Sequence, residues 1–116
     1  MRRYSSNAIG VDQGDRVLFS DFIDGGPMWT GDGPREFRFS VKFSEAYLHP
    51  PQVHLSMSMW DSDHKSNQRM DLSAEDISLD GFVLVFKTWG DSRIARVRAN
   101  WMAIGPVSHE DDWQLY

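Results

Sequence analysis

The sequence contains no cysteine among its 116 residues. Disulfide frameworks, thiolate zinc sites, iron–sulfur clusters and cysteine nucleophiles are therefore excluded. Basic residues are also few, because 12 lysines and arginines stand against 17 acidic residues and the net charge is −5. Domains that bind nucleic acid usually carry a basic patch that replaces phosphate counterions, so this balance argues against a nucleic-acid partner.

Long apolar runs are missing as well. No stretch approaches the ~20 apolar residues of a membrane-spanning helix, so membrane insertion is not expected. Residues 1–3 are basic, but residues 4–7 are polar where a signal peptide would have its apolar centre. A processed leader or release by lysis would both be compatible with this start, so the compartment stays open.

What the sequence does contain is the alternation of apolar and polar residues that is typical of a strand with one buried face. Six segments show this alternation or are short apolar runs: residues 16–20, 37–43, 53–59, 70–77, 81–89 and 92–104. Residues 81–89 are apolar on both faces, which indicates a central strand or one whose outer face meets a partner. No window has the 3.6-residue period of a helix. We therefore predict an all-β fold, a six-stranded antiparallel β-sandwich with almost no helix.

The pattern also predicts where the domain begins and ends. Residues 13–107 contain all six strands and form the expected sandwich. Residues 1–12 lack periodicity and are expected to be a loose N-terminal segment, and residues 108–116 are expected to be a polar tail. No internal repeat or linker divides the chain, which predicts a single domain.

Patterns of catalysis and metal binding are weak. No Gly-x-Ser-x-Gly elbow is present, and the four histidines have no recognisable spacing. Asp61, Asp63 and His64 share a loop, but the glycine and distal glutamate of a calcium loop do not follow. Paired carboxylates for glycoside hydrolysis have no sequence signature, and a small sandwich offers little depth for such a cleft. We expect a binding module with no catalytic residue, metal or cofactor.

Four segments, in this order, give the chain a family resemblance. They are Val41-Lys42-Phe43 leading to Pro50-Pro51-Gln52-Val53, Asp61 followed by Asn67-Gln68-Arg69, Gly81-Phe82 with Thr88-Trp89, and Trp101-Met102-Ala103-Ile104. In them the chain resembles the H-type lectin family of snail agglutinins and slime-mould discoidin C-terminal domains. The resemblance implies a six-stranded sandwich, homotrimers that sometimes stack into hexamers, and metal-free glycan sites at subunit boundaries. It also implies a role in cell adhesion outside the cell, at its surface or on a particle.

The resemblance assigns residues to a site for galactose or N-acetylgalactosamine. Asp32 stands where an aspartate accepts hydrogen bonds from sugar hydroxyls, with Thr30 at the neighbouring small-residue position. Arg69 stands where an arginine donates to the sugar, and Trp89 where a tryptophan provides an apolar wall across the subunit boundary. A carboxylate and a guanidinium suit a shallow, wet site because charge-assisted hydrogen bonds are the stronger ones.

Each assignment has an alternative. Arg69 could pair with Asp61 or Asp71 on the surface. Trp89 could pack in the core or at a subunit contact. Asp32 lies between two glycines and could be a simple turn residue.

Two positions depart from the snail agglutinin pattern, in the half of the site that recognises the N-acetyl sugar. Gly90 stands where a histidine follows the tryptophan, and Ala95 stands where an aromatic residue occurs. Asp91 could replace part of the lost polar contact. Phe86 stands at one cysteine of the snail protein's disulfide. The leading hypothesis is a trimeric lectin that binds galactose-type sugars through Asp32, Arg69 and Trp89. The alternative is a trimeric structural module, such as a phage-like fibre or tip domain, that has lost sugar binding.

Overall fold

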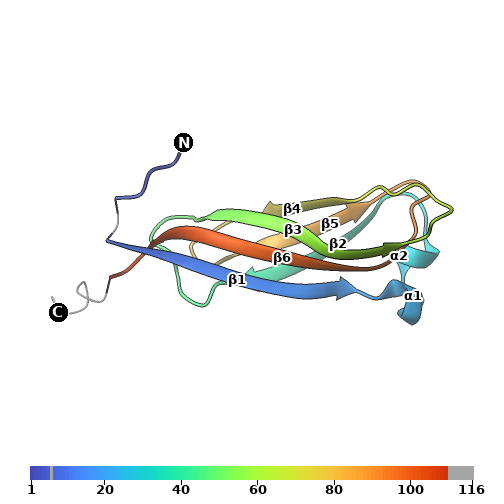
Figure 1. Cartoon of the computed structure of the whole chain (residues 1–116), viewed down its shortest axis with the longest axis horizontal. Helices are drawn as coiled ribbons and strands as arrows, with labels where there is room; N and C mark the ends of the chain where they lie inside the picture. The colour runs from blue at the N-terminus through green and yellow to red at the C-terminus, as the bar shows by residue number, and fades with distance from the viewer. Residues whose placement is uncertain (6, 110–116) are drawn as a thin grey trace.

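The structure, a computed structural model, describes residues 1–5 and 7–109. In this part of the chain the elements are, in order, β1 (Ala8–Phe19), α1 (Asp21–Asp24), α2 (Pro27–Thr30), β2 (Arg35–Lys42), β3 (Gln52–Ser62), β4 (Asp71–Glu75), β5 (Gly81–Thr88) and β6 (Ile94–Val107). The strands form two antiparallel sheets, with the orders β1-β6-β3 and β2-β5-β4 (Figure 1). The predicted six-stranded sandwich is confirmed.

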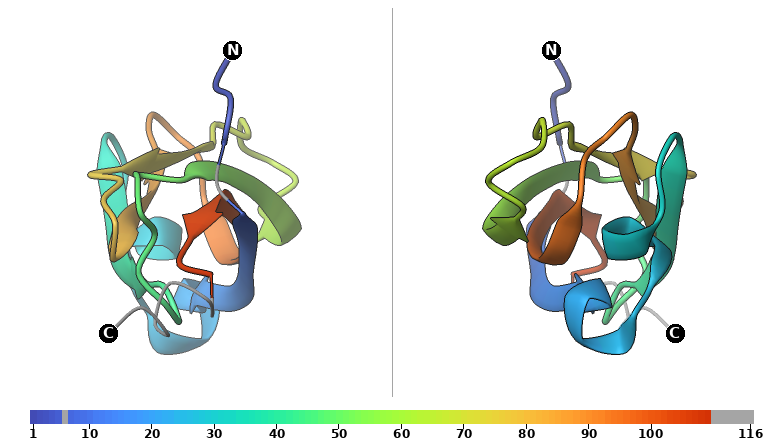
Figure 2. Two further views of the ribbon diagram at one scale, coloured as in Figure 1. Left: turned by 90° about the vertical axis from the view of Figure 1, so that its left-hand side faces the viewer. Right: turned by 90° about the vertical axis from the view of Figure 1, so that its right-hand side faces the viewer.

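The two sheets lie face to face as two layers, which the end views show (Figure 2). The helices α1 and α2 are single turns between β1 and β2, so the expectation of almost no helix is also confirmed. They lie at the end of the sandwich where β3 passes to β4 and β5 passes to β6 (Figure 1). No helix among the described residues is long and apolar enough to span a membrane. Of the predicted polar tail, residues 110–116 lie outside the described residues.

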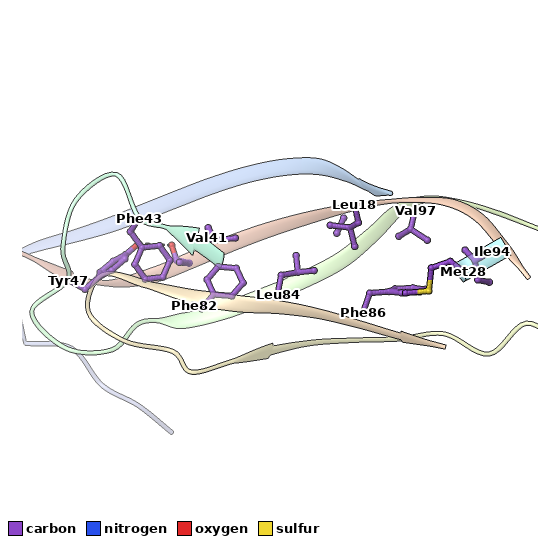
Figure 3. Packing of buried hydrophobic residues seen from close by; sticks show 12 residues of the cluster. Leu18, Met28, Val41, Phe43, Tyr47, Phe82, Leu84, Phe86, Ile94 and Val97 are labelled. Carbon is purple, nitrogen blue, oxygen red and sulfur yellow. Dashed lines mark hydrogen bonds between the residues drawn. The ribbon is translucent and has the colours of Figure 1, made fainter. Parts of the chain in front are cut away.

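The core fills the space between the layers with the apolar residues of the alternating pattern. Leu84 and Phe86 of β5 are fully buried and face the other sheet, where Val97 of β6 is also fully buried (Figure 3). At the opposite end of the core Phe43 packs edge-on against Tyr47, with ring centroids 5.1 Å apart. Burial of such side chains is the main favourable contribution to folding.

The apolar outer face of β5 is explained without a partner. β5 is the central strand of its sheet, between β2 and β4. Its outward-facing Val85 is completely buried between its two register partners, Arg38 of β2 and Ser73 of β4. The first of the two explanations that the sequence allowed is therefore the right one.

β1 begins eight residues before the apolar run that predicted it. We expected residues 1–12 to be a loose segment, but β1 (Ala8–Phe19) pairs with β6 from Ala8 onwards. The pattern was hidden because inward positions such as Gly10 and Gly14 carry no side chain, while the apolar Val11 faces solvent with 54% of its surface exposed. The inward space is filled from β6 and from the loop after β2.

Gly14 provides a test of this packing. A Cβ atom at residue 14 would overlap the indole of Trp101, which lies over the strand. We expect Gly14→Ala to lower the free energy of unfolding by about 1–3 kcal/mol, the usual cost of overpacking. Chemical denaturation measures this loss. In a Trp101→Phe background the same substitution should cost less, and an equal cost in both backgrounds would contradict the proposed overlap.

Candidate functional site

Three loops meet at the end of the sandwich that carries α1 and α2. They connect α2 to β2 (residues 31–34), β3 to β4 (residues 63–70) and β5 to β6 (residues 89–93). The Gly33 N–H donates to the Gly90 carbonyl at 2.9 Å, and the Asp63 N–H donates to the Arg93 carbonyl at 2.9 Å. These bonds bring residues that are far apart in the sequence into one surface.

Arg35 braces two of the loops from inside. Its guanidinium donates to the carbonyls of Gly33 at 3.0 Å, Met28 at 3.0 Å and Gly90 at 3.3 Å. A guanidinium can do this because its five N–H groups form a rigid fork. Sequence reasoning missed this residue, although one signal was present: Arg35 is a charged residue in phase with the inward-facing Phe37 of the same strand.

Arg69 is held by a carboxylate of the next loop. Its Nη1 lies 2.6 Å from Oδ1 of Asp91, and both side chains are partly exposed. The alternative pairing of Arg69 with Asp61 or Asp71 is therefore wrong, and Asp61 instead lies 3.5 Å from Arg96. Arg69 stays at the surface with its remaining N–H groups available.

Asp91 is itself held ionised. The side-chain amide and the backbone N–H of Asn67 donate to its carboxylate at 3.2–3.3 Å. These two hydrogen bonds, followed by that from Arg69, hold the pKa of Asp91 below its ordinary value. The Asp91 carboxylate therefore stays charged beside Arg69 at neutral and mildly acidic pH. Asn67 had no role in the sequence reasoning beyond its place in the family segment.

The backbone of Arg69 is fixed by two buried hydroxyls. Its N–H donates to Oγ of Ser92 at 2.9 Å, and its carbonyl accepts a hydrogen bond from the Thr88 hydroxyl. Ser92 also donates to the Asn67 carbonyl at 2.6 Å. Both hydroxyl residues are almost completely buried, so the backbone of Arg69, from which the side chain extends, is held in place. Nothing in the sequence distinguishes these two residues from ordinary strand-end residues.

Gly90 lets the Arg69 side chain lie across the loop. Its φ of +68° is left-handed, a conformation that glycine adopts readily. A Cβ at this position would lie 3.2 Å from Nη1 of Arg69. Glycine at position 90, where the snail agglutinin has a histidine, therefore leaves room for the Arg69 guanidinium. The other departure, Ala95, is buried with 7% of its surface exposed.

The aspartate loop offers one open acceptor. Asp32 is exposed, and its carboxylate accepts no hydrogen bond within the described residues. The Thr30 hydroxyl donates to the Gly26 carbonyl at 2.9 Å, so it is used to complete α2. The hydrogen bond from Gly33 to Gly90 places the loop that carries Asp32 next to Gly90. The hydroxyl proton of Thr30 is used within α2.

Trp89 is not a core residue. Its side chain is 43% exposed, which excludes the core alternative and leaves the subunit contact as a prediction. The indole borders a shallow depression of about 370 Å³ whose lining residues are Pro34, Arg35, Glu36, Lys87, Thr88 and Trp89. An aromatic wall thus stands directly beside Gly90.

The chemistry of this surface is that of reversible binding. It presents a free carboxylate, a partly free guanidinium and an exposed indole, with water able to reach all three. Among residues 1–5 and 7–109, no three acidic or histidine side chains lie close enough together to hold a metal ion. In the loop with Asp63 and His64, the imidazole lies 3.8 Å from the Asp63 carboxylate, which also lies 3.9 Å from Nη1 of Arg93.

Comparisons with known proteins agree with this picture. Residues 38–104 match the model of the H-type lectin domain. "ATP synthase subunits region ORF 7" of Fuscovulum blasticum is 59% identical over 108 residues, which cover 93% of this chain and 94% of that protein. A discoidin-1 polypeptide of Dictyostelium discoideum is 33% identical over 75 residues, which cover 64% of this chain and 30% of the discoidin.

The fold has a counterpart among solved structures. Recombinant discoidin II of Dictyostelium discoideum superposes with a TM-score of 0.74 at 23% identity, over 90% of this chain and 40% of the discoidin. The chain thus spans less than half the length of the discoidins that it matches. The domain model matches more than half of this chain, and it describes a lectin domain, not an enzyme. The chain belongs to the H-type lectin domain family.

Proposed function

We propose that this chain is a lectin module that binds galactose-type sugars, either galactose or N-acetylgalactosamine, at the surface formed by the three loops. The observation that supports this most is the pair of open groups, the Asp32 carboxylate and the Arg69 guanidinium, on loops joined by the Gly33–Gly90 hydrogen bond. Sugar hydroxyls both donate and accept hydrogen bonds, so an acceptor and a donor are needed. Trp89 supplies an apolar face for the C–H side of the ring.

Three further residues shape the site in this proposal. Asp91 orients Arg69 through their ion pair, and Gly90 leaves the space that the guanidinium occupies. Thr30 completes α2 and so fixes the start of the loop that carries Asp32. Because Gly90 brings no side chain, a preference for the N-acetyl group is not part of the proposal.

A glycan array on the purified chain tests the function. We expect glycans that end in galactose or N-acetylgalactosamine to bind, and Asp32→Ala to reduce binding at least about tenfold, since a hydrogen bond to a charged group contributes about 1.5–3 kcal/mol. Asp24→Ala is the matched control, because Asp24 is an exposed acid of α1 at the same end. An array on which the unmodified chain binds no glycan would contradict the proposal.

We also infer that the module works as a trimer, or as stacked trimers, with sites at subunit boundaries. The outer face of the sheet β1-β6-β3 supports this, because its outward residues along β1 and the paired part of β6 include only two charged side chains, Asp15 and Arg98. Its outward residues on β1 are Ile9, Val11, Gln13, Asp15 and Val17, and on β6 they are Pro106, Ile104, Met102, Asn100 and Arg98. Depletion of charge is what marks the centre of an interface between protein subunits.

The other sheet makes the contrast clear. The outer face of β2-β5-β4 carries Glu36, Arg38, Lys42, Asp71, Glu75 and Lys87. Ion pairs link Arg38 with Glu36 at 3.6 Å and with Glu75 at 3.5 Å. This face is charged, so the face formed by β1, β6 and β3 is the one that we assign to neighbouring copies.

One observation favours a second function, a structural or assembly module that has lost sugar binding. Arg69 is already engaged by Asp91 at 2.6 Å, and the neighbouring Gly90 offers no side chain to a ligand. In such a module Arg69 would serve only to join the loops. The glycan array separates the two functions, since the structural module would bind no sugar with or without Asp32→Ala.

A further inference from the structure

We propose that the depression beside Trp89 is a second sugar subsite, which takes the residue linked to the terminal galactose. The inference rests on the proposed function, because it assigns a neighbour to the sugar held by Asp32 and Arg69. Its consequence is that the module prefers oligosaccharides to free galactose.

The depression repeats the chemistry of the terminal site. Glu36 of β2 and Lys87 of β5 are register partners that line it, together with the indole of Trp89. It therefore joins a carboxylate acceptor, an ammonium donor and an aromatic surface, as the three loops do with Asp32, Arg69 and the same indole. Its volume of about 370 Å³ lies within the 300–1,000 Å³ that is typical of small-molecule sites.

The two charged groups have hydrogen-bonding capacity to spare. Nζ of Lys87 lies 3.8 Å from Oε1 of Glu36, and Arg38 lies 3.6 Å from the same oxygen. Both distances exceed the 2.7–3.2 Å of a hydrogen bond. Within the described residues, Glu36 and Lys87 therefore attract each other by charge without a hydrogen bond between them. A sugar hydroxyl placed between them can donate to the carboxylate and accept from the ammonium group. Charge-assisted hydrogen bonds of this kind are about twice as strong as neutral ones.

The position of the depression makes it continuous with the terminal site. Trp89 borders the depression and is followed by Gly90, whose Cβ position lies 3.2 Å from Nη1 of Arg69. Pro34, another lining residue, follows Asp32 by two residues. Asp32 and Glu36 are four residues apart, so at most about 14 Å of extended chain separates them.

Titration calorimetry on the full chain with galactose, lactose and melibiose tests the inference, since the two disaccharides carry β- and α-linked galactose. We expect at least one disaccharide to bind about tenfold more tightly than galactose. The double variant Glu36→Gln/Lys87→Ala should reduce that advantage to less than about twofold while galactose binds as before. Lys42→Ala, at the far end of β2, is the matched control and should leave all three affinities unchanged.

The three failures are distinguishable. If galactose and both disaccharides bind equally to the unmodified chain, the subsite is wrong and the terminal site stands. The subsite is also wrong if the double variant weakens galactose and disaccharide by the same factor. If none of the three sugars binds, the proposed function falls and the subsite falls with it.

Discussion

Replacing Arg69 with alanine is expected to abolish sugar binding while the protein stays folded. The guanidinium is the donor that the open carboxylate of Asp32 cannot replace, and removing a charged hydrogen-bond donor costs about 1.5–3 kcal/mol, or roughly 10- to 150-fold in affinity. A single shallow lectin site has little affinity to lose, so binding should fall below detection. Titration with the best glycan of the array measures it.

The fold should tolerate this change because the structural contacts of Arg69 belong to its backbone. Ser92 and Thr88 bind its N–H and its carbonyl, and neither contact involves the guanidinium. The unfolding transition of Arg69→Ala should therefore stay close to that of the unmodified chain. Arg96→Ala is the matched control, since Arg96 forms a comparable exposed pair with Asp61.

A second variant separates binding from loop joining. Asp91→Asn removes the charge that holds Arg69 but leaves the guanidinium in place. If Arg69 contacts sugar, this variant should keep measurable binding, and if Arg69 only links the loops, it should behave like Arg69→Ala. Unchanged glycan binding in Arg69→Ala would show that the donor lies elsewhere.

The fold could be predicted largely from the sequence because its strands bury one face and alternate accordingly. β2 and β3 show this with Phe37, Phe39 and Leu55 facing inward. β1 shows where the rule stops: its inward Gly10 and Gly14 are empty positions that Tyr47, Val107 and Trp101 fill from elsewhere. Alternation reports only the side chains that a strand contributes, and says nothing of the space that other elements fill.

The candidate site was predictable only in its exposed residues. Asp32, Arg69 and Trp89 could be named because the family resemblance assigns these residue types to a site, and the structure leaves all three side chains at least partly exposed. Arg35 and Ser92 could not, because they act through backbone carbonyls and N–H groups that only the folded loops bring within 3.3 Å. The engagement of Arg69 by Asp91 was missed for the same reason, since it depends on the conformation of Gly90.

The last prediction concerns assembly. Val11→Asp is expected to convert the proposed trimer into monomers, because it places a charge on the charge-poor outer face along β1 and β6 in every copy. Val11 is 54% exposed and opposite Ile104 of β6, so the isolated sandwich loses little by the change. At a contact between copies the same carboxylate must be desolvated beside its counterparts, and a buried unpaired charge is strongly unfavourable.

Sedimentation velocity at micromolar concentration shows the change directly. Ser40→Asp is the matched control, because Ser40 is an exposed strand residue on the charged outer face of β2. We expect Val11→Asp to change glycan binding more than it changes the free energy of unfolding. Three linked sites raise avidity by about 10²- to 10⁴-fold, so the variant should bind a glycan-coated surface more weakly by that factor. Val11→Asp that sediments as the unmodified trimer would move the contact to another face, and an unmodified chain that sediments as a monomer would rule out the shared site altogether.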